Sequence, residues 1–381
     1  MKILLICHEY PPIGGGSATV ASGLARALAG EHAVTVLTTA YRGLPAEERQ
    51  GAVAVRRART PRRAMYGASP PELIAFTLAA LWLGIRLCRR ERFDGCVAIQ
   101  GIPAAWVAWP LGWLFRFPYV VALVGADVPG FLPERFDRLH RAVAPLTRRT
   151  WRRAAAVTAN SESLRALAER TARPLGVPID TVFYGADTEL HRPSESGRDA
   201  WPIRFLFVGR LSTQKGPSYL VEAVARAHER LQGRATVVIV GDGEEREALE
   251  TRVRAEKLDD VVSFRGWLSR EDLARCYRES SVFVLPSLDE GRSQAVLEAM
   301  ACGLAIVATT IEGNAGLVES GVNGLAVPPR DAGALADALA TAVDLGPSKV
   351  MAMGDASRAR AVASSWQDAT RTYVRRIEAA R

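Results

Sequence analysis

The segment that decides the fold is Glu290–Gly303, which reads EGRSQAVLEAMACG. It follows a strand-like run, and its second half has helical spacing that ends at Gly303. A helix that begins at the end of a parallel strand points its first N–H groups into a crevice that attracts anions. The carboxylates of Glu290 and Glu298 suit hydroxyl groups better than phosphate. The segment therefore predicts a ligand that carries phosphate and sugar together.

Strand-like and helical runs alternate on both sides of a polar segment, Glu195–Pro202, which we interpret as a linker. The alternation predicts parallel α/β architecture in two domains. We expect residues 1–198 and 199–363 to form these domains and residues 364–381 to form a C-terminal helix. The predicted strands are Lys2–Cys7, Ala33–Thr38, Val97–Ile99, Tyr119–Val124, Ile203–Val208, Thr236–Val240, Val261–Phe264, Val282–Leu285 and Ala305–Thr309. The predicted helices are Ser17–Ala29, Tyr219–Leu231, Glu244–Glu256, Arg270–Glu279 and Gln294–Cys302.

Composition limits the compartment and the class of site. The 381 residues include five cysteines, which are dispersed and form no CxxC pair. This pattern argues against a disulfide framework or a thiolate metal site and favours a reducing compartment. The N-terminal apolar run is a short strand rather than a signal peptide. We therefore expect a cytoplasmic protein. No nucleic-acid partner is expected.

The positive charge is concentrated in the first half of the chain. Residues 1–200 hold 26 Lys/Arg and 17 Asp/Glu, a balance of +9, whereas the remainder has a balance of −1. Two interpretations stay open: a general preference for arginine on a solvated surface, or a face that meets anionic headgroups or an acidic acceptor.

Two apolar segments, Leu73–Leu87 and Ile102–Phe115, are shorter than the roughly 20 residues of a membrane-spanning helix. We expect both to be buried core. The alternative is attachment to the inner face of the cytoplasmic membrane through tryptophans, namely Trp82, Trp106, Trp109 or Trp113.

Cations and glycines follow two of the predicted strands in the second half and the first predicted strand of the chain. Arg210 and Lys215 lie just after the strand that ends at Gly209, and a planar guanidinium with a compact ammonium suits a diphosphate. Gly241-Asp242-Gly243 also ends a strand, where glycine lets a ligand approach the backbone. Early in the chain, Gly14-Gly15-Gly16 predicts a flexible loop over a ligand. Each of these could instead be an ordinary turn.

These motifs occur in one order and together resemble the retaining GT-B glycosyltransferases of family 4. The motifs are Gly209-Arg210-Leu211 with Lys215, Gly241-Asp242-Gly243, the E-x7-E pair, Met300-Ala301-Cys302-Gly303 and Asn323–Pro329. In the first half, Glu9–Pro12 with the three glycines resembles the family's opening loop, and Tyr184-Gly185-Ala186-Asp187 resembles its Asn-Gly-Val-Asp motif. The resemblance implies two Rossmann-like domains facing each other across a deep cleft.

The resemblance also implies a role for each site residue. Arg210, Lys215 and Glu290 would be catalytic: the two cations bind the donor diphosphate, and Glu290 contacts the transferred sugar. Glu298 would bind the ribose, and Gly266 with Trp267 would line the nucleobase pocket. The other implied donor-binding residues are Gly15, Gly16, Gly209, Gly241, Asp242, Gly291, Arg292 and Ser293. The acceptor oxygen would attack from the face that the diphosphate leaves, with a phosphate oxygen as base.

No metal and no cofactor beyond the nucleotide-sugar donor are expected, since the chain has no Asp-x-Asp motif. The partners would be a nucleotide sugar, a glycan or lipid-linked acceptor and, weakly, an anionic membrane surface. His8, Glu9 and Asp127 are the candidates on the acceptor side.

The chain departs from the family pattern at four places. Val124 stands where the family often has a histidine, and Arg292-Ser293 replaces Phe-Gly. Ala305-Ile306 replaces Pro-Val, and the donor loop Glu312–Gly316 lacks its glutamate. Two alternatives therefore stay open: a nucleotide-sugar epimerase of the same architecture, or a non-catalytic homologue that binds sugar nucleotides.

Overall fold

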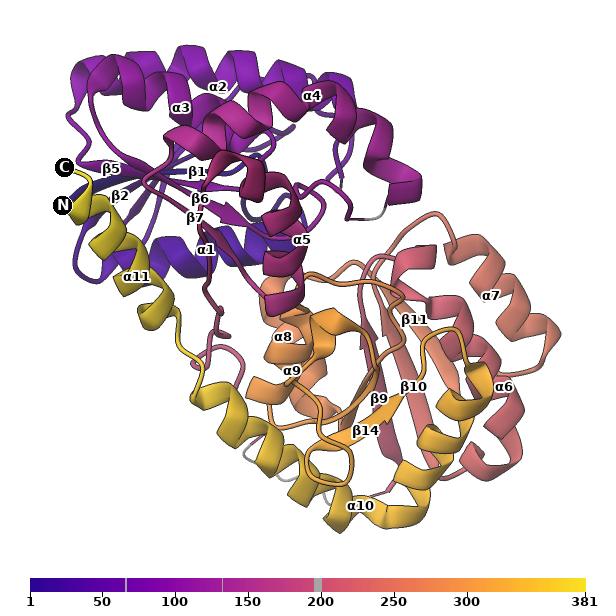
Figure 1. The fold of residues 1–381 in the computed structure, drawn as a ribbon. Coiled ribbons are helices and arrows are strands. Elements are labelled where there is room, and N and C mark those ends of the chain that lie inside the picture. The colour runs from indigo at the N-terminus through magenta and orange to yellow at the C-terminus, as the bar shows by residue number, and fades with distance from the viewer. Residues whose placement is uncertain (66, 132, 195–200) are drawn as a thin grey trace. The chain divides into compact units, whose positions relative to one another are not determined.

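The computed structural model describes residues 1–65, 67–131, 133–194 and 201–381 (Figure 1). The chain divides into two compact units, residues 1–184 with 365–381 (unit 1) and residues 185–364 (unit 2). The predicted boundary at 198 and most of the predicted linker lie outside the described residues. The division comes earlier because Asp187 and His191 already bond within unit 2, to Arg270 and Arg358.

Unit 1 contains an eight-stranded sheet with the order β3-β4-β2-β1-β5-β6-β7-β8. All its neighbouring strands are parallel except β3, which is antiparallel to β4 at the edge. The strands are β1 (Lys2–Ile6), β2 (Ala33–Thr39), β3 (Glu47–Gln50), β4 (Val53–Ala58), β5 (Gly95–Ile99), β6 (Tyr119–Leu123), β7 (Ala156–Ala159) and β8 (Ile179–Thr181). The helices are α1 (Gly16–Ala29), α2 (Pro70–Arg90), α3 (Ala104–Phe115), α4 (Pro133–Arg153), α5 (Glu162–Ala172), the short η1 (Arg173–Leu175) and α11 (Trp366–Ala379).

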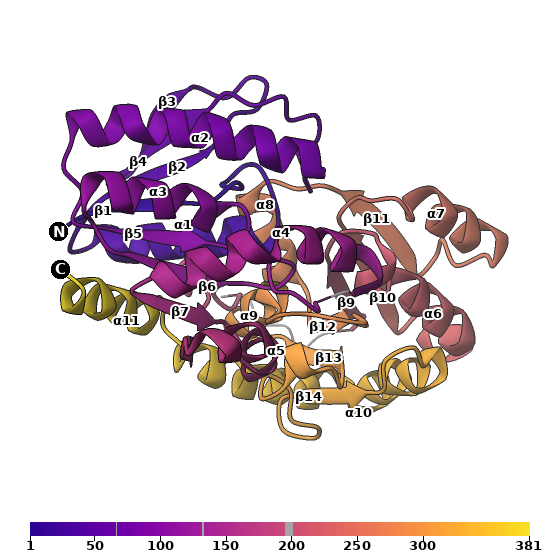
Figure 2. The same ribbon diagram turned by 45° about the horizontal axis from the view of Figure 1, so that its top comes forward.

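Helices cover both faces of this sheet, because alternate residues of each strand point to opposite sides. Leu4 and Ile6 of β1 belong to the core beneath α2, α3, α4 and α5, which form one layer (Figure 2). Ile3 and Leu5 belong to the other core, beneath α1 and α11. The C-terminal helix α11 closes that second core with Trp366, Tyr373 and Ile377.

Unit 2 is built around a six-stranded sheet with the order β11-β10-β9-β12-β13-β14, parallel throughout. The strands are β9 (Ile203–Val208), β10 (Ala235–Val240), β11 (Val262–Gly266), β12 (Val282–Leu285), β13 (Ala305–Thr309) and β14 (Gly324–Val327). The helices are η2 (Thr213–Lys215), α6 (Pro217–Leu231), α7 (Arg246–Ala255), α8 (Arg270–Glu279), α9 (Gln294–Ala301), η3 (Glu312–Asn314) and α10 (Ala332–Val362), which is kinked at Gly346.

Both units are therefore Rossmann-like, as predicted, while the cleft between them stays a prediction. Each sheet has a switch point where the strand order reverses, between β1 and β5 in unit 1 and between β9 and β12 in unit 2. Ligands of open parallel sheets bind beyond the carboxyl ends of the strands at such points. The two switch points are where functional residues should be sought.

The segment Leu73–Leu87, predicted to be buried core, is buried on one side only. It lies within α2, which packs on the sheet through Phe76, Ala80 and Gly84 and leaves its other side exposed. Among the described helices, α2 alone is long and apolar enough to cross a membrane, judged by length and composition only.

Candidate functional site

Lys215 and Glu290 meet at the switch point of unit 2. Lys215 ends η2, which follows β9, and Glu290 lies in the loop after β12. Lys215 Nζ donates to Glu290 Oε1 at 2.5 Å, and the same oxygen accepts the Ser287 hydroxyl at 2.8 Å. The Glu290 side chain is 8% exposed and that of Lys215 is 22% exposed. The cation is therefore the more accessible member of the pair.

Two hydrogen bonds join the loops that carry this pair. Gln214 donates its side-chain amide to the Asp289 carbonyl at 3.1 Å, and its own carbonyl accepts Leu288 N–H at 2.8 Å. Burial and the neighbouring Glu290 raise the pKa of Asp289 above its usual value. These two bonds fix the loop of Lys215 against the loop of Glu290. The distance between the two residues therefore does not depend on their flexible side chains alone.

Glu298 lies two turns into α9 and is nearly buried. Tyr277 of α8 donates its hydroxyl to Glu298 Oε2 at 3.1 Å. Burial, with the neighbouring Glu298 carboxylate, raises the pKa of Tyr277 well above its usual value, which keeps the phenol a donor. His191 stacks edge-on against Tyr277 at 5.7 Å between ring centroids, and burial lowers its pKa. Tyr277 thus orients one carboxylate oxygen and leaves the other available.

The loops after β9 and β10 pack directly against each other. A Cβ at Gly241 would lie 1.9 Å from the Gly209 carbonyl oxygen, so glycine is required there. Asp242 accepts the adjacent Gly243 N–H at 2.8 Å and lies 3.5 Å from Arg246. Arg210 is partly buried and forms no ion pair with any described residue, which leaves its guanidinium available to an anion.

The start of α9 carries the residues that depart from the family pattern. Ser293 caps the helix by accepting Val296 N–H, and burial lowers the pKa of Arg292 to about 10. The Gln294 side chain is buried, and neither of its amide atoms has a partner among the described residues. Asn314 is also buried and donates to the Thr309 carbonyl. Polar groups therefore line this end of the site where the family pattern has Phe-Gly.

Gly266 and Trp267 lie at the carboxyl end of the edge strand β11. Trp267 is 47% exposed, and the Arg246 guanidinium lies near Gly266. An exposed indole at the carboxyl edge offers a face on which a planar base can stack.

In unit 1, Glu9 follows β1 and is enclosed by partners. Arg62 donates to Glu9 Oε1 at 3.0 Å, Ser17 donates to Oε2 at 2.5 Å, and His8 lies 3.7 Å away. Burial would raise the pKa of Glu9, but His8, Arg62 and the Ser17 hydroxyl hold it below its usual value. Burial lowers the pKa of His8. Glu9 and Arg62 therefore hold the loop after β1 in place.

The glycine loop is less free than predicted. Gly14 has φ +96°, donates to the Met65 carbonyl at 2.9 Å, and has no room for a Cβ beside the Glu9 side chain. Gly16 is the first residue of α1. Of the three glycines, Gly15 and Gly16 alone have open space beside them. A ligand could therefore approach the backbone at these two residues.

Asp127 acts in the structure as a backbone clamp rather than as an exposed acid or base. Its Oδ2 accepts Gly101 N–H at 2.7 Å, and its Oδ1 accepts the N–H groups of Val124 and Gly125 at 3.1 and 2.9 Å. The side chain is buried, and burial raises its pKa despite these bonds. The carboxylate joins the loops after β5 and β6.

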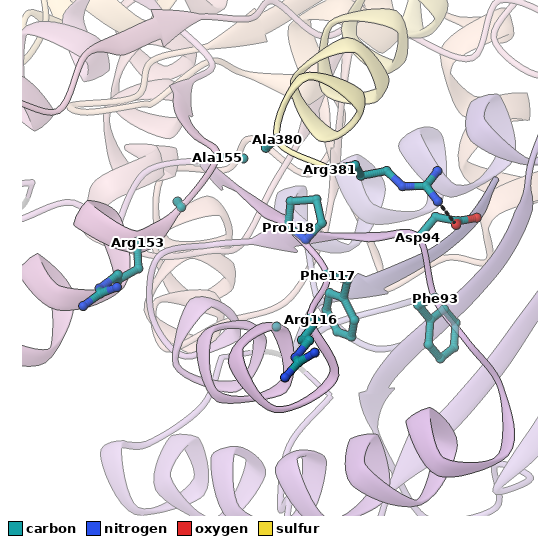
Figure 3. Close-up of a pocket in the computed structure, with 11 residues that line it drawn as sticks. Phe93, Asp94, Arg116, Phe117, Pro118, Arg153, Ala155, Ala380 and Arg381 are labelled. Carbon is teal, nitrogen blue, oxygen red and sulfur yellow. Dashed lines mark ion pairs between the residues drawn. The ribbon is translucent and has the colours of Figure 1, made fainter.

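A cavity of about 400 Å³ lies at the opposite, amino edge of the unit 1 sheet (Figure 3). Its lining includes Phe93, Pro118 and Ala155, which precede or begin strands, together with Arg116 and Arg153. In Figure 3 these two arginines do not point toward each other, and Arg381 pairs with Asp94 at 2.7 Å. The cavity lies at the edge of the sheet away from the unit 1 switch point, so it is not the candidate site.

The pattern of the sequence did not identify Tyr277, Ser287, Gln214 or Arg62 as contacts of the site residues. Ser287, three residues before Glu290, had the clearest local signal. Tyr277 could not be found because its link to Glu298 spans 21 residues between two helices. Among the described residues, no group of three or more His, Cys, Asp or Glu is placed to hold a metal ion.

Two protein-family models together match most of the chain. Residues 202–344 match the model described as glycosyl transferases group 1, and residues 15–185 match the model described as glycosyl transferase 4-like domain. A D-inositol 3-phosphate glycosyltransferase of Kribbella flavida is 34% identical over 204 residues, 50% of this chain and 48% of that protein. This chain thus matches about half the length of that curated relative. An uncharacterized glycosyltransferase of Methanocaldococcus jannaschii is 27% identical over 88% of this chain and 87% of its own.

Solved structures share the fold over the whole chain. Sucrose-phosphate synthase from Thermosynechococcus elongatus superposes with a TM-score of 0.82 at 22% identity, covering 100% of both chains. Anabaena HepE, solved with UDP-glucose, has a TM-score of 0.77 at 20% identity and the same coverage. At these identities the likeness shows the GT-B fold.

Proposed function

We propose that this chain, which belongs to the glycosyl transferases group 1, is a retaining glycosyltransferase that works without a metal ion. It would move a sugar from a nucleotide-diphosphate sugar to a glycan or lipid-linked acceptor at the cytoplasmic side of the membrane. The observation that carries the proposal is the Lys215–Glu290 pair at the switch point of unit 2.

The pair is suited to exchange partners when a donor binds. The diphosphate of the donor would take Lys215 from Glu290, because a dianionic group offers more charge than one carboxylate. Arg210, which has no ion pair among the described residues, would bind the same group. Glu290 would then be free to accept hydroxyl groups of the transferred sugar.

The rest of the donor would extend along the same edge of the sheet. Glu298 has one oxygen held by Tyr277, so the other can accept ribose hydroxyls. Trp267 offers its exposed ring to the base. HepE was solved with UDP and with UDP-glucose, which supports a nucleotide sugar as the ligand class. Arg292, Gln294 and Asn314 would contact the sugar and set donor preference.

The chemical step needs charge stabilisation rather than a protein nucleophile. The acceptor hydroxyl oxygen would attack the anomeric carbon from the face that the diphosphate leaves. As the sugar–phosphate C–O bond breaks, its electron pair stays on the phosphate oxygen, which takes the acceptor proton. Lys215 and Arg210 would stabilise the charge that develops on the diphosphate, and fixed charges of this kind are usually the main source of an enzyme's rate enhancement.

The test is release of nucleoside diphosphate and of glycosylated product from a panel of UDP-, GDP- and ADP-sugars, with and without acceptor lipids and glycans. The wild type should turn over one donor class in the presence of EDTA, and the product should keep the donor's anomeric configuration by NMR. Glu298→Ala and Lys215→Ala should lose turnover. If these variants match the wild type, the site is wrong. Conversion of the sugar nucleotide without acceptor would instead indicate an epimerase, and binding without turnover a non-catalytic homologue.

A further inference from the structure

One side of α2 is exposed and apolar over three turns. Ile74, Leu78 and Trp82 recur at four-residue spacing and are 56%, 66% and 61% exposed. The opposite side of α2 packs on the sheet through Phe76, Ala80 and Gly84. A row of large, exposed apolar side chains on one helix face is typical of an interaction surface. Single exposed apolar residues, in contrast, are common on any protein.

The neighbouring helix α3 extends this surface. Trp113 is 77% exposed and Leu114 is 51% exposed at its C-terminal end. The two helices touch where Gly84 of α2 meets Leu111 of α3, within a turn of Trp82 and Trp113. Both helices cover the same face of the unit 1 sheet, so their exposed sides both turn away from it (Figure 2). We call Ile74, Leu78, Trp82, Trp113 and Leu114 the α2–α3 outer surface.

The helices of this layer are rich in arginine. The sequences of α2, α3 and α4 hold ten arginines and three carboxylates, a balance of +7 within a chain of net charge +8. Arg86 lies over the Trp82 ring at 4.6 Å, and Arg149 of α4 lies over the Trp109 ring at 4.9 Å. Arg116, directly after α3, lines the amino-edge cavity.

Helix dipoles alone do not explain this arrangement. Arg89, Arg90, Arg152 and Arg153 lie in the last turns of α2 and α4, where cations complement the carbonyl ends. Stabilisation of the helix ends accounts for these four arginines. It does not account for the exposed side chains of Leu78, Trp82 and Trp113. Tryptophan at a polar boundary with arginine beside it is the composition of a bilayer interface, where the indole sits at the headgroup level.

A second group of arginines in the first half, Arg56 to Arg63, lies only partly at the surface, where Arg59 and Arg63 are exposed. Arg57 is buried and bonds Glu48 at 2.7 Å, and Arg62 is buried against Glu9. Of the two groups, the arginines of α2–α4 are the ones that pack on partly exposed tryptophans, as Arg86 does on Trp82.

We propose that the α2–α3 outer surface docks unit 1 on a bilayer that contains anionic lipid. The apolar residues enter the headgroup boundary and the arginines bind the lipid phosphates. The α2–α3 outer surface contains no residue of the donor site, but the purpose of docking, access to a lipid-linked acceptor, rests on the proposed function.

The test is co-sedimentation of the full chain with vesicles of phosphatidylcholine alone and of phosphatidylcholine mixed with phosphatidylglycerol. We expect binding to the mixed vesicles, weakening as salt rises, with a blue shift of tryptophan emission. Leu78→Ser with Trp82→Ser should lower the partition about tenfold. Arg148→Glu with Arg152→Glu, at two exposed arginines of α4, should lower it by a similar factor. The matched control is Trp201→Ser with Val322→Ser, which removes one exposed tryptophan and one exposed aliphatic residue of unit 2. The control should bind as the wild type does.

Absence of wild-type binding to the mixed vesicles at low salt would overturn the proposal, as would equal binding by the Leu78/Trp82 variant. So would self-association of the wild type that this variant abolishes, because the surface would then be an interface between copies of the chain. Lys215→Ala should bind vesicles normally. A chain that binds vesicles but transfers no sugar would therefore refute the proposed function and leave the docking surface intact.

Discussion

The carboxyl edges of the two sheets carry similar charged residues and use them in opposite ways. In unit 1, Glu9 and Asp127 are enclosed by donors from their own unit. In unit 2, Glu290 holds a lysine that is still partly exposed, and Arg210 has no ion pair among the described residues. A charge whose bonds are all made inside the fold contributes to stability, whereas a charge that can exchange its partner is available to a ligand.

The difference follows from what it costs to remove each group. Deleting a carboxylate that accepts several buried N–H groups leaves those donors without partners, at about 1–3 kcal/mol each. Deleting a partly exposed cation leaves one carboxylate that a neighbouring hydroxyl and water can satisfy. Mutation should therefore separate the two edges, with loss of stability in unit 1 and loss of turnover in unit 2.

The largest expected effect is that of Lys215→Ala on turnover. Removing one preorganised charge from the developing diphosphate should lower kcat by about 10²–10³-fold. Steady-state release of nucleoside diphosphate measures it, and Lys349→Ala, at an exposed lysine of unit 2, is the control. A wild-type kcat for Lys215→Ala would mean that Lys215 serves the stability of unit 2, as the charged residues at the carboxyl edge of unit 1 do in theirs.

Asp127→Ala should reduce stability instead. It leaves the N–H groups of Gly101, Val124 and Gly125 without their acceptor, at a cost of about 3 kcal/mol in the free energy of unfolding. Chemical denaturation measures this, with Asp137→Ala, from an exposed pair with Arg141, as control. A variant of unchanged stability that has lost turnover would show that Asp127 takes part in the chemistry and would break the comparison.

Tyr277→Phe should have an intermediate effect within unit 2. It removes the hydroxyl that orients Glu298, so the KM for the donor should rise about three- to tenfold while kcat changes little. Initial rates over a range of donor concentrations separate the two constants. A fall in kcat with unchanged KM would mean that Tyr277 supports the chemical step rather than the ribose contact.

The smallest expected effect concerns Glu72, which caps α2 in unit 1. Hydrogen bonds from Ser69 and from the Arg63 N–H lower the pKa of Glu72 from 4.5 to about 2. A lowered pKa in the folded state means that this contribution is present above pH 4.5 and lost as the pH falls through about 2. Because the group is exposed, Glu72→Gln should cost about 0.5 kcal/mol at neutral pH.

Unfolding curves of Glu72→Gln and wild type over this pH range test that expectation. Glu31→Gln, at an exposed glutamate that caps no helix start, is the control. A difference between Glu72→Gln and wild type that does not shrink toward low pH would show that the carboxylate is not the cap.

The donor edge could be predicted from sequence because its residues lie close to strand ends. Arg210, Lys215 and Glu290 each follow a strand that is buried and strongly apolar, and the observed bounds of β9, β12 and β13 equal the predicted ones. Parallel strands bring their carboxyl ends to one edge, so the order of motifs along the chain gives their grouping in space.

The edge of unit 1 could not be predicted in this way because its bonds join distant parts of the chain. Arg62 reaches Glu9 across 53 residues, and Asp127 reaches Gly101 across 26. Nothing local distinguishes a carboxylate that clamps backbone from one that awaits a substrate. The strands β3, β4, β7 and β8, and β14 in unit 2, were not predicted either. β3 and β4 carry charged residues, and β7, β8 and β14 have only three or four residues, too few for a pattern to be recognised.

The central claim is that Lys215 leaves Glu290 for the donor diphosphate. Calorimetric titration of UDP, GDP and ADP into the wild type, Lys215→Ala and Asp127→Asn tests it most directly. We expect that one nucleotide binds the wild type, that Lys215→Ala weakens its binding about tenfold or more, and that Asp127→Asn binds it as the wild type does. Equal affinity of the wild type and Lys215→Ala would contradict the claim.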